Sequence, residues 1–168
     1  MVELGILRED EPLELIDGEL VEVNPQGPIH STLAVRVRRA LDRIYGETAH
    51  VRDHSPIEAG ENSLPEPDVA VVRGAPEDYL EHHPRADELI LVVEIAYTSR
   101  NIDRAKAAVY ARAGVRTYWL VDVPARRIEV RTEPSPRGEY RVTTMVEEDA
   151  ELALPERDET LPVAALLP

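Results

Sequence analysis

Residues 88–97 read ELILVVEIAY, an almost uninterrupted apolar run that is rich in β-branched side chains. Strands buried on both faces have this composition, whereas half-exposed strands alternate apolar and polar residues. The run therefore predicts a central strand that is covered on both sides. Within it Glu94 shares a face with Ile90 and Val92. Because burial of an ionised carboxylate is costly, Glu94 needs a charged partner or a metal ion.

The segments on either side of this run combine strand and helix patterns. Further strands are expected at 50–59, 68–73, 116–123, 128–132 and 140–146, and helices are expected at 28–45 and 102–113. An apolar turn at 162–167 is expected to dock on the sheet. This mixture predicts an α/β fold.

An N-terminal β-hairpin is expected at residues 13–23, LELIDGELVEV. Two apolar runs flank Asp17-Gly18 there, a dipeptide that favours the type I′ turn because both central positions of that turn have positive φ. In a two-residue loop of this kind, Ile16 faces Glu19 across the hairpin.

Length and composition limit the class of protein. The chain has 168 residues, of which 43% are apolar and 31% charged. That length predicts a single domain over residues 1–168, and the composition excludes a largely disordered chain. The absence of cysteine excludes disulfides and thiolate zinc sites and favours a reducing cytoplasm. The first twelve residues do not resemble a secretory signal, and the longest apolar stretch is five residues, against the roughly 20 that a membrane span needs. We therefore expect a soluble cytoplasmic protein without membrane contact.

Lysine and arginine occur in very unequal numbers. The net charge is -14, and the basic residues are 18 arginines and one lysine, Lys106. Lysine differs from arginine in being a compact point charge whose pKa shifts readily, so the exception favours a chemical role. The alternative is a lysine stem packed on an apolar surface with its ammonium reaching outward to a structural salt bridge.

Two carboxylates and this lysine form a candidate site. Asp68 begins one expected strand and Glu94 lies near the end of another, so the two converge if these strands are antiparallel neighbours. In the helix 102–113, Lys106 lies on the apolar stripe, with Asp103 and Tyr110 beside it. Two carboxylates and a lysine at one end of a sheet can hold a divalent metal ion and offset charge on a scissile phosphate.

These residues carry a resemblance. Pro67-Asp68, Glu94-Ile95-Ala96 and Lys106 resemble the PD-(D/E)xK signature of restriction-endonuclease-like nucleases, with the lysine moved from the strand to the following helix. A longer ordered series, over about residues 13–166, is similar to the bacterial Uma-type family of candidate endonucleases. That series comprises ELIDGE at 14–19, His30, PDVAVV at 67–72, VVE at 92–94, Lys106 with Tyr110, AGV at 113–115 and YWLVD at 118–122.

The resemblance implies both a fold and a chemistry. The fold is a restriction-endonuclease-like mixed central sheet flanked by helices, and the activity is hydrolysis of phosphodiester bonds in DNA with Mg²⁺, for which Mn²⁺ can substitute. The implied metal ligands are Asp68, Glu94 and the backbone carbonyl of Ile95. Lys106 takes the place of the usual lysine, since Ala96 stands where the superfamily has that residue.

The resemblance also includes two residues outside the implied metal ligands. Glu19 and His30 match positions typical of the family, which implies either that they line the cleft or that they are structural. Glu14 is expected to be an ordinary hairpin glutamate. The histidine pairs His50 with His54 and His82 with His83 are weaker candidate metal ligands, because no third ligand is evident in the sequence.

The net charge requires that any DNA contact use a local basic surface. The stripe of Arg36, Arg39 and Arg43 is one candidate, and Arg100, Arg104 and Arg112 lie near the expected site; a solvated charged face is the alternative.

Two other functions stay open. One alternative is a catalytically inactive nuclease fold that acts as a binding or assembly module in a homodimer. The presence of Asp68, Glu94 and a lysine favours an enzyme instead. Sugar hydrolysis by a carboxylate pair ranks last, because the chain has only seven aromatic residues for a sugar platform.

Overall fold

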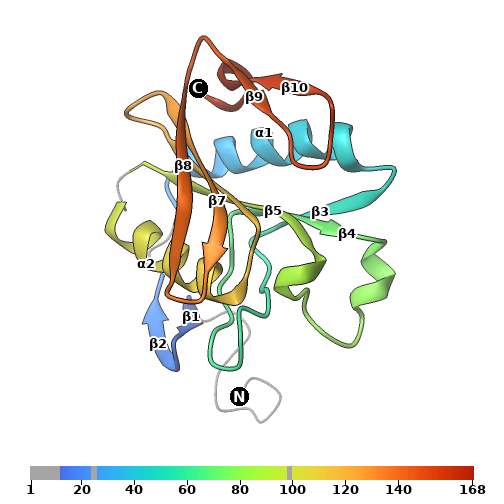
Figure 1. Ribbon diagram of the computed structural model, residues 1–168, viewed down its shortest axis with the longest axis vertical. Coiled ribbons are helices and arrows are strands. Elements are labelled where there is room, and N and C mark those ends of the chain that lie inside the picture. Colours follow the sequence, from blue (N-terminus) through green and yellow to red (C-terminus); the bar gives the residue numbers. More distant parts are fainter. Residues whose placement is uncertain (1–11, 24–25, 98–99) are drawn as a thin grey trace.

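The computed structural model describes residues 12–23, 26–97 and 100–168, with the backbone alone at 100–104 (Figure 1). The elements in chain order are β1 (Leu13–Ile16), β2 (Glu19–Glu22), α1 (Pro28–Tyr45), β3 (Ala49–Asp53), β4 (Val69–Arg73), η1 (Pro76–Tyr79), η2 (Ala86–Glu88), β5 (Leu89–Ala96), α2 (Arg100–Ala113), β6 (Thr117–Asp122), β7 (Arg127–Ser135), β8 (Glu139–Glu147), β9 (Glu151–Ala153), β10 (Thr160–Pro162) and η3 (Val163–Leu166).

One mixed sheet organises the molecule. Its six strands are ordered β3-β4-β5-β6-β7-β8. The β5–β6 pair is parallel and every other neighbouring pair is antiparallel. A parallel pair needs a crossover connection, which α2 provides between β5 and β6. The expected mixed sheet flanked by helices is therefore confirmed.

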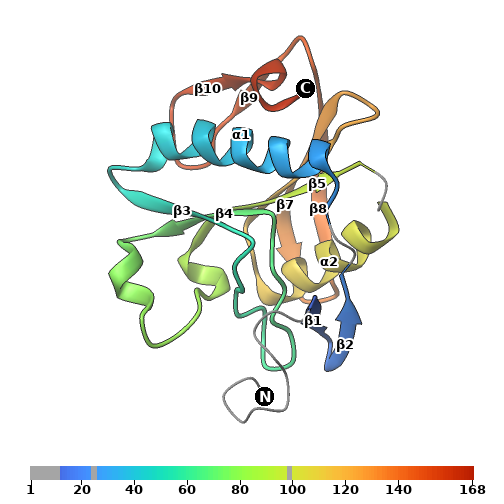
Figure 2. The same cartoon turned by 180° about the vertical axis from the view of Figure 1, so that it is seen from behind.

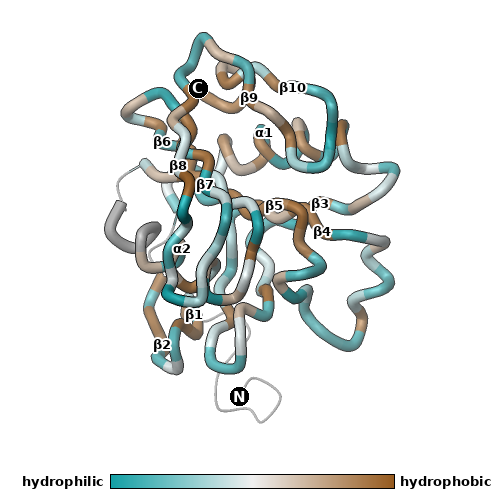
Figure 3. Tube along the Cα trace, in the orientation of Figure 1, coloured by the Kyte–Doolittle hydropathy of each residue, from teal (hydrophilic) through white to brown (hydrophobic). Residues whose placement is uncertain are grey.

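β5 is the central strand that the run at 88–97 predicts. All eight of its residues are buried, and the hydrophobic colour in Figure 3 is concentrated in the middle of the sheet around it. Because side chains alternate along a strand, Val93 and Ile95 join the cluster that includes α1, whereas Val92 and Ala96 join the cluster that includes α2. Glu94 therefore belongs to the α2 side of the sheet.

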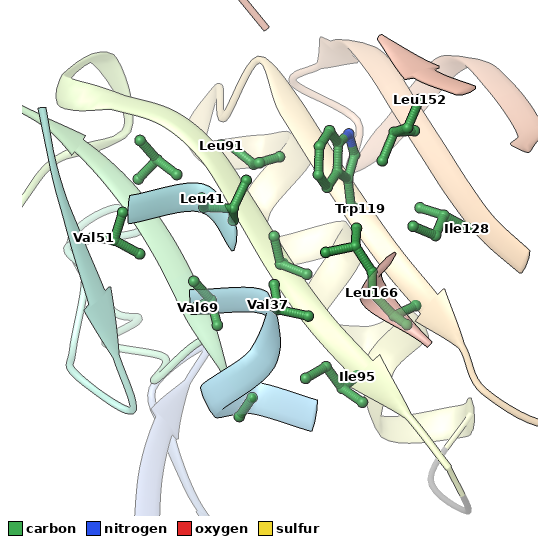
Figure 4. Packing of buried hydrophobic residues seen from close by; sticks show 14 of the residues in the cluster. Val37, Leu41, Val51, Val69, Leu91, Ile95, Trp119, Ile128, Leu152 and Leu166 are labelled. Carbon is green, nitrogen blue, oxygen red and sulfur yellow. The ribbon is translucent and has the colours of Figure 1, made fainter. Parts of the chain in front are cut away.

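The two helices cover opposite faces of this sheet (Figures 1 and 2). Val37 and Leu41 of α1 are fully buried and lie over Val69, Leu91 and Ile95 (Figure 4). The C-terminal turn η3 packs into the same cluster, which confirms the docking expected for 162–167.

The N-terminal hairpin also forms as expected. Its register places Ile16 opposite Glu19, and both turn residues have positive φ, 51° at Asp17 and 84° at Gly18. The hairpin is a separate two-stranded sheet, which lies near α2 in Figures 1 and 2.

The expected strand at 50–59 is wrong in its second half. β3 ends at Asp53, where Asp53 pairs with Val69, the first residue of β4. Beyond that point no β4 residue remains to pair, and His54 turns the chain with a φ of 42°.

The described residues contain no helix that is both long and apolar enough to cross a membrane.

Packing of α1 gives a stability prediction with an internal control. Val37 is 0% exposed and Val35 is 45% exposed on the same helix. Val37→Ala should lower the free energy of unfolding by about 1–3 kcal/mol, because it removes buried methyl groups and leaves a cavity. Val35→Ala should change it by less than about 0.5 kcal/mol. Urea denaturation measures both, and equal losses would contradict the described packing of α1.

Candidate functional site

Asp68 and Glu94 meet because β4 and β5 are antiparallel. Val69 pairs with Val93, so the residues one step further out, Asp68 and Glu94, stand opposite each other. Their exposed fractions are 6% and 3%. The convergence predicted from the sequence therefore occurs, at a buried position beside the start of β4.

Lys106 points into this site from α2. Its Nζ lies 2.9 Å from Glu94 Oε1 and 3.1 Å from Glu14 Oε1, and it donates a 2.9 Å hydrogen bond to the carbonyl oxygen of Glu66. The side chain is 8% exposed. The ammonium thus does not reach outward into solvent, and three acceptors match its three N–H groups.

Both oxygens of the Asp68 carboxylate have hydrogen-bonding partners. Oδ2 accepts a 2.7 Å hydrogen bond from the Ile95 amide and lies 3.0 Å from His30 Nε2. Gln26 Nε2 donates to Oδ1 at 3.2 Å and also contacts His54 Nδ1 at 3.0 Å. Burial opposes ionisation of Asp68, but the contacts with His30 and the Ile95 amide outweigh it and lower the pKa of this carboxyl. Asp68 is accordingly an anion in this site.

Glu94 has the opposite electrostatic balance. Burial is the largest influence and raises the pKa of Glu94 to about 8, with Lys106 opposing the rise and the charge of Asp68 adding to it. The Tyr110 hydroxyl donates a 2.6 Å hydrogen bond to Glu94 Oε1. Burial lowers the pKa of Lys106, but Glu94 and Glu14 outweigh burial and raise it. Lys106 therefore keeps its proton, and a further cation would favour ionised Glu94.

The charges of this cluster suit a divalent cation. If ionised, Asp68, Glu94 and Glu14 carry three negative charges against one positive charge on Lys106. The contacts of Glu94 that the structure describes all end on Oε1, which leaves Oε2 for another ligand. Among the described residues, no three His, Asp or Glu side chains form a ready metal cluster. Mg²⁺ nevertheless accepts one or two carboxylates and completes its shell with water, so the donor set fits this ion.

The structure places the other sequence candidates as follows. His30 joins the site through Asp68. Glu19 is exposed on the hairpin and is not part of the buried cluster, and the side chain of Asp103 lies outside the described residues. His50 lies in β3 and His54 follows its end. The two do not form a pair, because His50 Nδ1 contacts the Gly74 carbonyl whereas His54 Nδ1 contacts Gln26. His82 contacts the backbone carbonyl of His83.

Glu14, Gln26 and His54 contact the site although the sequence does not place them there. The expectation that Glu14 is an ordinary hairpin glutamate is wrong, because Glu14 is 6% exposed and bound to Lys106. The sequence does carry a signal for it, because Glu14 lies on the same hairpin face as the apolar residues Ile16 and Val21. Gln26 and His54 carry no comparable signal, because they reach Asp68 only through the path of the folded chain.

The expected basic stripe lies on the outer side of α1. A groove of about 750 Å³ is lined by Arg36, Arg39 and Arg43 together with apolar residues that include Val35 and Leu161. Arg36 donates to the carbonyl oxygen of Leu167. In the part of the chain that the structure describes, neither Arg39 nor Arg43 forms an ion pair.

The second group of expected basic residues contributes less to this surface. Arg112 forms a 2.6 Å ion pair with Asp17 of the hairpin, so its charge is already offset. The side chains of Arg100 and Arg104 lie outside the described residues. Arg39 and Arg43 are therefore the best placed of the predicted arginines to meet an anion.

A solved structure has the same fold. Over 98% of this chain and 94% of the other, the structure resembles that of a protein described as "a putative nuclease belonging to DUF820" from Anabaena variabilis ATCC 29413, with a TM-score of 0.78 and 20% sequence identity. At that identity the likeness concerns the fold. No curated protein matches the chain.

A family model extends the likeness to the sequence. The model of the Uma2 family, described as "Putative restriction endonuclease", matches residues 2–164. That span includes the hairpin, both strands that carry the carboxylates, and the helix that carries Lys106. The chain therefore belongs to the Uma2 family.

Proposed function

We propose that this protein is a metal-dependent endonuclease that hydrolyses phosphodiester bonds in DNA. The observation that carries the proposal is the buried Lys106 ammonium, 2.9 Å from Glu94 and on the same side of the sheet as Asp68. Membership of the family described as "Putative restriction endonuclease" supports the reaction class. The structural neighbour, described as "a putative nuclease", agrees with it.

Mg²⁺ is the proposed cofactor, and Mn²⁺ can substitute for it. Asp68, Glu94 and the backbone carbonyl of Ile95 are the proposed ligands, and water completes the shell. When bound, the ion would polarise the scissile phosphate and lower the pKa of a nearby water. The donor set supports this assignment, because a divalent cation would favour ionised Glu94 and offset the carboxylate charges that Lys106 alone does not balance.

The protein side chains have separate tasks in this proposal. Lys106 donates a hydrogen bond to a non-bridging phosphate oxygen and offsets the charge that develops there in the transition state. His30 and the Ile95 amide hold Asp68 ionised and fixed in orientation. Tyr110 orients Glu94 through its 2.6 Å hydrogen bond.

DNA binding by a chain of net charge -14 needs a local positive surface. We assign this role to Arg39 and Arg43, since both line the groove on α1 and neither is engaged by a described acid. α1 begins at the turn that carries His30, so the groove starts close to the proposed reaction site. Phosphates bound in this groove would belong to nucleotides that flank the cleaved bond.

Metal binding can be tested without any substrate. Calorimetric titration with Mn²⁺ should show one site in the wild type and an affinity at least about tenfold weaker in Asp68→Asn, because a carboxylate ligand is lost. The control is Asp53→Asn, which removes a partly exposed carboxylate that pairs with Arg38 and should leave the affinity unchanged. Equal affinities in wild type and Asp68→Asn would refute the assignment of Asp68.

Cleavage should depend on Lys106. Lys106→Met should reduce Mg²⁺-dependent cleavage of plasmid DNA by on the order of 10² or more, because transition-state charge is no longer offset. It should also lower the free energy of unfolding by about 3–5 kcal/mol, since two buried carboxylates lose their counter-charge. Rates must therefore be compared below the unfolding temperature of the variant.

Two further variants separate charge from geometry. Lys106→Arg keeps a positive charge but should not restore the rate, because a planar fork does not replace a point donor in a tight site. Arg126→Met removes an exposed cation that pairs with Glu148, outside the site, and should cleave like the wild type. Full activity in Lys106→Met would exclude Lys106 from the chemistry, and inactivity of the wild type would favour a binding module.

The arginine surface predicts a change in salt dependence. Arg39→Ala with Arg43→Ala should weaken DNA binding and lower the slope of log affinity against log salt by about two, one for each lost phosphate contact. Arg126→Ala is the control, because Arg126 is already paired with Glu148. Fluorescence anisotropy with labelled duplex DNA measures both slopes. An unchanged slope in the double variant would place the DNA elsewhere.

A further inference from the structure

We propose that Glu14 is a positioning residue, whose carboxylate retains Lys106 in the site when Glu94 exchanges its ion pair for a divalent cation. This inference rests on the proposed function, and it assigns the N-terminal hairpin a part in it. Glu14 contacts the lysine and not the metal ligands, so its action passes through Lys106.

The hydrogen bonds of Lys106 lead to this assignment. An ammonium has three N–H groups, and three acceptors lie at 2.9–3.1 Å: Glu94 Oε1, Glu14 Oε1 and the Glu66 carbonyl oxygen. All three N–H groups are therefore occupied in this structure. An N–H becomes available for a phosphate only when one acceptor withdraws, and Glu94 is the acceptor that a cation would engage.

Charge explains why a second carboxylate is required. In the structure, Lys106 has two carboxylate partners, Glu94 and Glu14. If a cation engaged Glu94 and Glu14 were absent, the ammonium would keep only a neutral carbonyl beside a metal of like charge, and repulsion would move it away. Glu14 supplies a negative charge that remains with the lysine.

Hydrogen bonds and an ion pair hold the hairpin in place and so position Glu14. The Leu64 amide donates to the Leu15 carbonyl and the Gly18 amide donates to the Asn62 carbonyl, both at 2.7 Å. The Asp17 amide donates to Ser63 Oγ at 2.9 Å. On the α2 side, Arg112 pairs with Asp17 at 2.6 Å. Contacts on two sides fix β1, so Glu14 does not depend on Lys106 to stay in place.

Selective labelling of one amine can test the proposal. Lys106 is the sole lysine of the chain, so acetylation by an N-hydroxysuccinimide ester, followed by mass spectrometry, reports its accessibility with the N-terminal amine as an internal standard. In the wild type, Lys106 should stay protected from acetylation both with and without Mn²⁺. Glu14→Gln, which removes the charge but keeps the shape, should be acetylated about tenfold faster with Mn²⁺ than without it, the factor expected from loss of a hydrogen bond to a charged group.

The control is Glu22→Gln on the exposed side of the same hairpin, which should match the wild type in both conditions. If circular dichroism shows that Glu14→Gln unfolds, Glu14→Asp is measured in the same way. Its increase in acetylation rate on addition of Mn²⁺ should lie between that of the wild type and tenfold. Acetylation of the Glu14 variant that is independent of Mn²⁺ would overturn the proposal, because a merely structural glutamate would expose the lysine equally in both conditions.

Kinetics provide the second measurement. Glu14→Gln should lower kcat about tenfold and leave KM for DNA unchanged, since Glu14 does not touch the substrate. An unchanged kcat would overturn the role of Glu14 while the nuclease proposal stands. If the wild type cleaves no DNA, the proposed function fails, and the acetylation result still decides whether Glu14 retains the lysine.

Discussion

The buried ion pair between Lys106 and Glu94 is the interaction on which the rest of the structure depends. It joins α2 to the central strand β5, and the contact of Lys106 with Glu14 joins the N-terminal hairpin to both. Burial of charge is costly unless every group has a counter-charge or a hydrogen bond. Helix, strand and hairpin must therefore all be in position before any of these charged side chains can be buried.

This arrangement contributes little net stability for the number of groups that it immobilises. Apolar residues of the same volume would pack between α2 and the sheet at no greater cost, as Ala107 and Leu120 do on the same side of the sheet. A concentration of charge in a buried position, where the rest of the interface is apolar, is instead typical of functional sites. The site therefore trades stability for a preorganised charge distribution.

The electrostatics of the whole chain limit how the proposed endonuclease could bind DNA. A net charge of -14 repels phosphates. In the proposed function, attraction would come from a cation at the carboxylates and from Arg39 and Arg43 on α1. An acidic nuclease of this design would bind DNA only where these two local sources of positive charge act together.

The local elements and part of the site can be predicted from the sequence alone. The apolar run at 88–97 predicts β5, Asp17-Gly18 predicts the hairpin turn, and the helical period turns Lys106 inward, because each of these features depends on neighbours within a few residues. The end of β3 and the remaining residues of the site follow from contacts between distant parts of the chain. Pairing with β4 ends at Asp53, and Glu14 reaches Lys106 across a separation of 92 residues. Sequence spacing specifies periodicity along one element, whereas contacts between distant elements depend on the register and packing of the whole sheet.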